Sequence, residues 1–307
     1  KCESNYLKKK PEFPYPLKEV SEKKGAGVIK YTPYGNTLLT DLALELIVNE
    51  ELGLDEYTDF LSVSYSSTDY AGHAFGPRSL EVQDMYIKLD LEIARLIDQL
   101  DSQVGKGNYT LFLTSDHGAV DCPGTKANPN EYVDSEAIKA RVDSICEVEY
   151  GLKLVSHISN FQIWFDHALI NEMFLNVDDV AFVVAEKMIE YNDGKAFAQC
   201  WTKGDLMMCD EPTCLQFKNA FDEDLSGDAF FMTTEGYLYS SSNIGTSHGT
   251  GYSYDTHVPF ILYGANVNRG SSSSEIIIQD IVPTLLNLIE VMPNTTFDGE
   301  SRVNLMR

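Results

Sequence analysis

The stretch from residue 58 to residue 77, TDFLSVSYSSTDYAGHAFGP, joins an apolar run to a polar turn that carries two possible ligands. Its first part, Thr58–Tyr65, has the length and the apolar content that are typical of a buried strand. Asp69 and His73 follow in the turn, four residues apart. A loop or a single helical turn with this spacing directs a carboxylate and an imidazole toward one point. The stretch therefore predicts a strand that is followed by a pair of metal-ligating side chains.

A second segment of the same kind, YTLFLTSDHG, spans residues 109–118. Its first six residues predict a strand, and Asp116 and His117 follow beside a glycine that allows a sharp backbone turn. Between the two strands, Ser79–Leu100 predicts a helix with one apolar face, capped by Ser79. This order predicts an α/β fold with a central, mostly parallel sheet that is flanked by helices. Because ligands collect beyond the carboxyl ends of parallel strands, both polar turns should face one crevice.

The remainder of the chain predicts further helices and strands around a less regular middle region. The first 35 residues contain Pro11, Pro14, Pro16 and Pro33 and predict an irregular lead-in. We expect one domain over residues 1–307, with an inserted cap region at about 124–245. The other predicted helices are Asp41–Leu52, Ser135–Tyr150, Val177–Tyr191 and Gln279–Ile289, and the other predicted strands are Phe161–Phe165 and Val258–Tyr263.

A fifth possible ligand, His248, lies in the glycine-flanked segment GTSHGTG before the last predicted strand. Taken singly, an Asp after a strand is more often a cap or turn residue, and a His beside a glycine is often only a loop residue. Together, the two Asp-His pairs and His248 place five nitrogen and oxygen donors after strands in a chain that has only six histidines. This combination favours zinc. Of the other histidines, His157 and His167 are interpreted as structural, and His257 as a residue that supports the ligands.

The composition excludes one class of partner. The formal net charge is −24, with 47 acidic and 23 basic residues, whereas binding to a nucleic-acid backbone requires clustered Lys and Arg. Divalent metal ions can supply the positive charge that a phosphate ester needs from such an acidic protein. No apolar run approaches the roughly 20 residues of a membrane-spanning helix, so the sequence predicts no membrane span.

The cysteines form an even set without a Cys-x-x-Cys pair, which favours disulfides or buried thiols over a thiolate zinc site. Three of them, Cys200, Cys209 and Cys214, are close enough in the sequence to contain one short-loop bridge. Six unpaired thiols in a reducing compartment remain the alternative. The complete set is Cys2, Cys122, Cys146, Cys200, Cys209 and Cys214.

The segments SSTDYAGHAFGP, TSDHG and SHGTGYSYDTHVP resemble motifs of the alkaline phosphatase superfamily. The most similar branch is the phosphate-irrepressible phosphatases, which are related to the nucleotide pyrophosphatase/phosphodiesterases. The resemblance implies an alkaline-phosphatase-like fold, two zinc ions and a periplasmic or extracellular location, although the chain contains no signal peptide. It also implies that Asp69, His73 and His248 hold one zinc, while Asp116 and His117 supply two ligands of the second.

The resemblance further implies a Thr or Ser nucleophile and another Asp ligand upstream of the segments that match. Thr37, in YGNTLL, is the only glycine-flanked hydroxyl near the start, and we interpret it as a helix cap or turn residue. The sequence is therefore expected to be N-terminally incomplete, to lack the nucleophile and to be inactive alone.

The implied activity of the intact enzyme is hydrolysis of a small phosphate monoester through a phospho-Thr or phospho-Ser intermediate. A phosphodiesterase or nucleotide pyrophosphatase with the same two-metal site is one alternative. A non-catalytic metal-binding domain is an alternative from another class. The sequence gives neither the physiological ester nor the oligomeric state.

Overall fold

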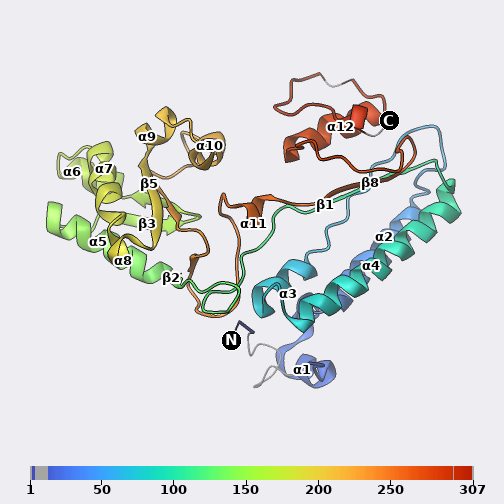
Figure 1. Cartoon of the computed structure of the whole chain (residues 1–307), viewed down its shortest axis with the longest axis horizontal. Coiled ribbons are helices and arrows are strands. Elements are labelled where there is room, and N and C mark those ends of the chain that lie inside the picture. The colour runs from blue at the N-terminus through green and yellow to red at the C-terminus, as the bar shows by residue number, and fades with distance from the viewer. Residues whose placement is uncertain (1, 4–12, 293, 306–307) are drawn as a thin grey trace. The chain divides into compact units, whose positions relative to one another are not determined.

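The computed structural model describes residues 2–3, 13–292 and 294–305; Pro11 of the predicted lead-in lies outside them. The described residues form two compact units, and Figure 1 labels their helices and strands. Unit 1 consists of the described residues within 1–28, 69–83 and 117–258. Unit 2 consists of those within 29–68, 84–116 and 259–307. Helices and strands occur in both units, in agreement with the predicted α/β class.

Unit 1 holds most of the described strands. Two helices that reach it, α3 (Ser67–Phe75) and α4 (Leu80–Leu100), continue into unit 2. The other elements of unit 1 are α1 (Leu17–Lys24), β2 (Tyr132–Asp134), α5 (Ser135–Tyr150), β3 (Val155–Ser159), β4 (Gln162–Phe165), α6 (His167–Glu172), α7 (Val177–Met188), α8 (Tyr191–Gly194), β5 (Phe197–Thr202), α9 (Lys203–Met208), α10 (Pro212–Asn219), β6 (Ala229–Thr233), β7 (Leu238–Ser240) and α11 (Ser253–Thr256).

The core of unit 1 is a four-stranded antiparallel sheet in the order β3-β4-β6-β5, covered by α5 and α7. Strand β6 is buried along its whole length. Phe231, on this strand, is fully buried. Its ring lies 5.4 Å from that of Phe197 and 5.3 Å from that of Tyr239, both in edge-on geometry. Aromatic packing at the centre of the sheet therefore stabilises this unit.

Unit 2 is built around α2 (Pro33–Asn49), which packs against the part of α4 that lies in this unit. Figure 1 shows these two long helices side by side. Their contact buries Ala43, Ile47 and Leu96. Strand β1 (Thr110–Thr114) pairs antiparallel with β8 (Phe260–Gly264), with Thr110 opposite Gly264. The remaining elements of unit 2 are a π-helical turn at Asp101–Gly105, α12 (Ile281–Leu288) and three 3₁₀ turns. These 3₁₀ turns are at Ala26–Tyr31, Ile278–Asp280 and Val303–Leu305, and the first of them begins in unit 1.

Helix predictions with a clear apolar face are confirmed. Helix α5 has the predicted bounds, and α4 begins one residue after Ser79, whose Oγ accepts a hydrogen bond from Val82 N at 3.2 Å. The predicted helix Asp41–Leu52 is observed as α2, which starts earlier because Pro33 occupies its first turn, where a proline is tolerated. The proline-rich lead-in is less irregular than predicted, since it contains α1 and a 3₁₀ turn.

Two strand predictions need correction. The segment Thr58–Tyr65 is not a strand: no described strand pairs with it, and Leu61 and Val63 pack against the α2–α4 contact instead. Apolar content alone cannot supply the main-chain partners that a strand requires. The described strands also do not form one mostly parallel sheet. Only β2 and β7 are parallel, whereas the β1–β8 pair and the four-stranded sheet are antiparallel.

Four of the six cysteines form disulfides. One joins Cys209 to Cys214, in agreement with the predicted short-loop bridge, and the other joins Cys2 to Cys122. Cys146 and Cys200 are free thiols. No helix in the described part of the chain is long and apolar enough to cross a membrane.

Replacement of Phe231 by Ala is expected to lower the free energy of unfolding by about 3–5 kcal/mol, because it removes a buried ring and leaves a cavity. Urea denaturation followed by circular dichroism measures this change. Phe174→Ala is the matched control, since Phe174 is 96% exposed and its replacement should change the value by less than about 0.5 kcal/mol. Equal effects of the two substitutions would contradict the packing described for unit 1.

Asp280 gives a pH-dependent prediction for unit 2. Its buried carboxylate accepts hydrogen bonds from Glu300 N and Arg302 Nε, both at 2.7 Å. Burial raises the pKa of Asp280, but these bonds and the charge of Arg302 lower it to a net value below the usual one. A carboxyl whose pKa is lower in the folded than in the unfolded state stabilises the fold above the unfolded pKa of about 3.9 and loses this effect as the pH falls.

Asp280→Asn is therefore expected to lower the free energy of unfolding by about 1–3 kcal/mol at pH 7. The difference from the unsubstituted chain should shrink below about pH 4, where the aspartate becomes protonated. Urea titrations at several pH values measure it. Asp210→Asn serves as the control because the Asp210 side chain is 96% exposed. A difference that stays constant down to pH 2 would rule out the charge of Asp280 as its cause.

Candidate metal centre

Helix α3 places Asp69 and His73 one turn apart on the same face. His73 Nε2 lies 3.3 Å from Asp69 Oδ1. Positions i and i+4 are neighbours on a helix surface, so the local fold alone brings the carboxylate and the imidazole together. The sequence prediction that this pair shares one point is confirmed.

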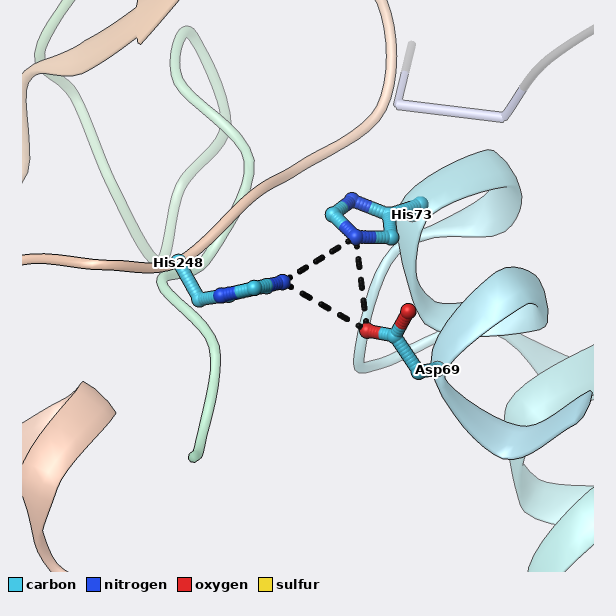
Figure 2. Close-up of side chains that lie close together, drawn as sticks. All are labelled: Asp69, His73 and His248. Carbon is cyan, nitrogen blue, oxygen red and sulfur yellow. Dashed lines mark hydrogen bonds and ion pairs between the residues drawn. The ribbon is translucent and has the colours of Figure 1, made fainter. Parts of the chain in front are cut away.

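His248 reaches the same point from an irregular segment far along the chain. Its Nε2 lies 3.2 Å from His73 Nε2 and 3.8 Å from Asp69 Oδ1. Figure 2 shows the two imidazoles and the carboxylate directed toward one another. One ligand atom from each residue lies within 4.8 Å of the others. Two imidazole nitrogens and one carboxylate oxygen are a donor set that zinc accepts, and together they leave a fourth coordination position open.

Main-chain hydrogen bonds hold the His248 segment against α3. His73 Nδ1 lies 2.7 Å from the carbonyl oxygen of Thr246, and Thr246 N donates to the carbonyl oxygen of His73 at 3.1 Å. Gly245 has a φ of 85°, and a Cβ on it would lie 2.1 Å from the His73 carbonyl oxygen. Only glycine therefore allows this approach. The sequence does not indicate this role of Thr246, because the contact is made by the main chain and leaves no signal in the side-chain type.

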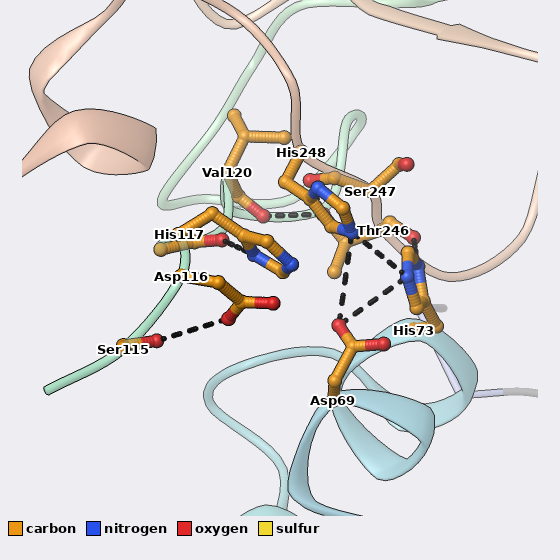
Figure 3. A network of polar contacts seen from close by, with 10 residues as sticks. Asp69, His73, Ser115, Asp116, His117, Val120, Thr246, Ser247 and His248 are labelled. Carbon is orange, nitrogen blue, oxygen red and sulfur yellow. Dashed lines mark hydrogen bonds and ion pairs between the residues drawn. The ribbon is translucent and has the colours of Figure 1, made fainter. Parts of the chain in front are cut away.

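His117 lies beside His248. The two rings are stacked, with centroids 3.3 Å apart and planes inclined by 12°. His117 Nδ1 lies 2.9 Å from the carbonyl oxygen of Gly118. Figure 3 shows His117 next to the three donors, although it is not one of the cluster formed by Asp69, His73 and His248.

Asp116 directly precedes His117 in the chain and is the last residue of its segment of unit 2. Its carboxylate accepts a hydrogen bond from Ser115 Oγ at 3.5 Å, as drawn in Figure 3. The structure therefore brings four of the five predicted ligands together within unit 1. For Asp116, the role of metal ligand stays a prediction from the sequence.

The donors influence one another's protonation. Burial raises the pKa of Asp69, but the hydrogen bond to His73 and the charges of the three neighbouring histidines lower it to a net value below the usual one. The hydrogen bond to Asp69 raises the pKa of His73. Burial lowers the pKa of His248, and the charges of His117 and His73 lower it further. An ionised Asp69 and a neutral His248 are the forms that bind a metal.

The other histidines have separate environments. His157 stacks on Trp164 with ring centroids 4.3 Å apart, and His167 Nε2 lies 2.8 Å from Asp228 Oδ1. These contacts agree with their interpretation as structural residues. His257 ends α11 through its main-chain N–H, and a supporting role for its side chain stays a prediction.

Thr37 is neither a helix cap nor a turn residue, which corrects the prediction from the sequence. It lies inside α2, whose N-cap is Thr32. Its Oγ1 donates to Glu92 Oε1 at 2.7 Å. The hydroxyl thus serves the contact between α2 and α4, and the glycine that flanks it in the sequence belongs to the same helix.

The chain is similar in sequence to known proteins over most of its length. Alkaline phosphatase PafA of Elizabethkingia meningoseptica is 34% identical over 293 residues, which are 92% of this chain and 52% of PafA. A calcium-transporting ATPase of Myroides odoratus is 35% identical over 295 residues, which are 93% of this chain and 54% of that protein. The chain thus spans about half the length of the curated relatives it matches.

The fold and the family follow from two further comparisons. The crystal structure of wild-type alkaline phosphatase PafA superimposes with a TM-score of 0.91 and 31% identity, over 100% of this chain and 59% of that one. This likeness confirms the predicted alkaline-phosphatase-like α/β fold. The sequence model described as type I phosphodiesterase / nucleotide pyrophosphatase matches residues 4–256. The chain therefore belongs to the type I phosphodiesterase / nucleotide pyrophosphatase family, and it is similar to the alkaline phosphatases within the superfamily that its motifs indicated.

Proposed function

We propose that the protein that carries this chain hydrolyses small phosphate monoesters with the help of bound zinc. The observation that supports this most is the convergence of Asp69, His73 and His248 from two distant segments on one point. The names of the similar proteins, an alkaline phosphatase and an ATPase, both denote hydrolysis of a bond to phosphorus. The acidic composition fits the same proposal, because bound cations supply the positive charge that the chain lacks.

We propose that the intact enzyme binds two zinc ions. Asp69, His73 and His248 would hold one, and Asp116 and His117 would supply two ligands of the other, as the family motifs imply. When bound, a pair of such ions stabilises the negative charge on the attacking and departing oxygens of an in-line displacement. The donor set fits zinc by its mixture of imidazole nitrogens and carboxylate oxygens.

Main-chain carbonyls fix the position of the proton on two of the histidines that are proposed to bind zinc. The carbonyl oxygen of Thr246 accepts the proton of His73 Nδ1, and that of Gly118 accepts the proton of His117 Nδ1. Each bond keeps the proton on Nδ1 and leaves the lone pair of Nε2 available to a metal. The tautomer of both ligands is thus set before any ion binds.

The proposed reaction proceeds in two displacements. A Thr or Ser hydroxyl of the intact enzyme attacks phosphorus, the ester oxygen leaves, and water then hydrolyses the phosphorylated side chain. The hydroxyl of Thr37 donates to Glu92 within the helical part of unit 2, which supports the expectation that another residue is the nucleophile.

A phosphodiesterase or nucleotide pyrophosphatase is the second candidate. The description of the matching family supports it directly. The donors of the site do not distinguish the two reactions, because monoester preference depends on cationic groups around the extra phosphoryl oxygens. A non-catalytic metal-binding domain would carry the same donors without turnover.

We also propose that residues 124–245 form an inserted region within a single hydrolase domain. Its ends lie side by side, since β2 pairs in parallel with β7 and Tyr132 is opposite Leu238. Between these strands, the chain builds the four-stranded sheet and its helical cover. An insertion of this kind leaves and rejoins the parent fold at one place.

The two disulfides support a periplasmic or extracellular location. Cys2–Cys122 and Cys209–Cys214 require an oxidising environment to form and persist.

Zinc binding tests the ligand assignment without any need for activity. His248→Ala is expected to weaken zinc binding by more than about 100-fold, because even the loss of a residue that supports a ligand costs 10–100-fold. Competition with a chromophoric chelator measures the affinity. His167→Ala is the control and should bind like the unsubstituted chain. His117→Ala should retain the ion at the three-donor cluster, and loss of all zinc from that variant would contradict the assignment.

Hydrolysis of a chromogenic phosphate monoester and a chromogenic diester, with zinc present, tests the reaction itself. The assays compare this chain with the full gene product that carries it. Faster cleavage of the monoester supports the proposal, and faster cleavage of the diester favours the second candidate. Zinc binding by the full product without cleavage of either ester would make the protein a metal-binding relative. His248→Ala should abolish the activity, whereas His167→Ala should keep it.

A further inference from the structure

Asp255, in the short helix α11, has two carboxylate oxygens in different surroundings. The residue is only 3% exposed. Its Oδ2 accepts hydrogen bonds from Thr250 N at 2.8 Å and from Thr250 Oγ1 at 2.7 Å. Its Oδ1 is buried and has no hydrogen-bond partner among the described residues. A buried carboxylate oxygen without a donor is costly, so a donor for Oδ1 is expected in the functional state of the protein.

The main chain of Asp255 is bonded to the other histidine segment. Its carbonyl oxygen accepts a hydrogen bond from Gly118 N, directly after His117, at 2.7 Å. A Cβ on Gly118 would lie 2.0 Å from the carbonyl oxygen of Tyr254, so only glycine permits this contact. One residue therefore holds the segment of His117 through its main chain and the segment of His248 through its side chain, by way of Thr250.

His248 lacks the support that the other two histidines have. Its Nε2 faces His73 and Asp69, which leaves Nδ1 as the nitrogen that must carry the proton when a metal binds. Within the described residues, no hydrogen-bond partner of His248 Nδ1 is found, whereas Nδ1 of His73 and of His117 each face a carbonyl oxygen.

We propose that Asp255 is the positioning residue of His248, with Oδ1 accepting the Nδ1 proton, directly or through one water molecule, when Nε2 binds the metal. The inference rests on the proposed metal site. Asp255 Oδ1 is a buried acceptor without a donor, and His248 Nδ1 has no hydrogen-bond partner among the described residues of the same unit. A carboxylate in this position fixes the tautomer and the orientation of a metal-bound histidine and raises its basicity.

Asp255→Asn separates this role from simple support of the loop. An aspartate offers an acceptor oxygen to Thr250 and another to His248, whereas an asparagine of the same shape has one oxygen and can serve only one of them. Thr250→Val removes the hydroxyl bond to Oδ2 and leaves both carboxylate oxygens in place. The inference therefore predicts that Asp255→Asn weakens zinc binding by about 10–100-fold and that Thr250→Val has a clearly smaller effect.

Asp228→Asn is the matched control. Asp228 also joins a main-chain N–H, that of Phe165 at 2.9 Å, to a histidine, His167 at 2.8 Å, in unit 1. His167 is not among the metal donors. This variant should bind zinc within about twofold of the unsubstituted chain, and circular dichroism checks that all variants are folded.

NMR of the zinc-loaded chain provides a second measurement. In the unsubstituted chain the Nδ1 proton of His248 should exchange slowly with solvent, and in Asp255→Asn it should exchange rapidly. Equal zinc affinity of Asp255→Asn and the unsubstituted chain would overturn the inference while leaving the metal site intact. Equal losses in Asp255→Asn and Thr250→Val, with an unchanged Nδ1 proton, would reduce Asp255 to a loop support. Failure of the unsubstituted chain to bind zinc would instead overturn the proposed function and this inference together.

Discussion

The hydrogen bond between His73 Nδ1 and the carbonyl oxygen of Thr246 is the constraint on which the rest of the site depends. It joins residues that are 173 positions apart and brings a helix and an irregular segment together. One bond does two things. It fixes the tautomer of His73, and it holds the segment that delivers His248 to the same point. Because Gly245 makes its close approach to the same main chain, a side chain there would separate the two halves of the cluster.

The three donors lie close enough together to serve one cation. The Nε2 atoms of His73 and His248 lie 3.2 Å apart, within hydrogen-bond distance, and Asp69 adds a carboxylate beside them. A divalent ion would take the place of the proton between them and accept all three lone pairs. Asp255 adds a buried carboxylate oxygen that has no donor in the described residues. Polar groups that are costly to bury are retained where they serve a ligand.

The packed interior of unit 1 holds the segments that carry His117 and His248 in place. The segments of His117 and His248 are bonded to each other, since Val120 N donates to the carbonyl oxygen of Ser247 at 3.4 Å, and the second segment is also bonded to strand β6. Tyr252, for example, donates its hydroxyl proton to the carbonyl oxygen of Thr233, at the end of that strand. His117 and His248 therefore lie on irregular segments, and the segment that follows His248 is bonded to the buried strand β6, which is how a rigid scaffold positions a site.

Sequence by itself determined the local features of this protein: the helices with an apolar face, the Asp69-His73 spacing on one turn, and the family that its motifs indicate. These depend on interactions between residues a few positions apart, so the pattern of residue types is sufficient to predict them. Tertiary structure alone decided which strands pair, that Thr58–Tyr65 has no strand partner, and that Thr246 and Asp255 support the histidines. Such contacts join the main chains and buried side chains of distant segments, and they arise only when the chain is packed, because neither a carbonyl oxygen nor a buried carboxylate reveals its partner in the sequence.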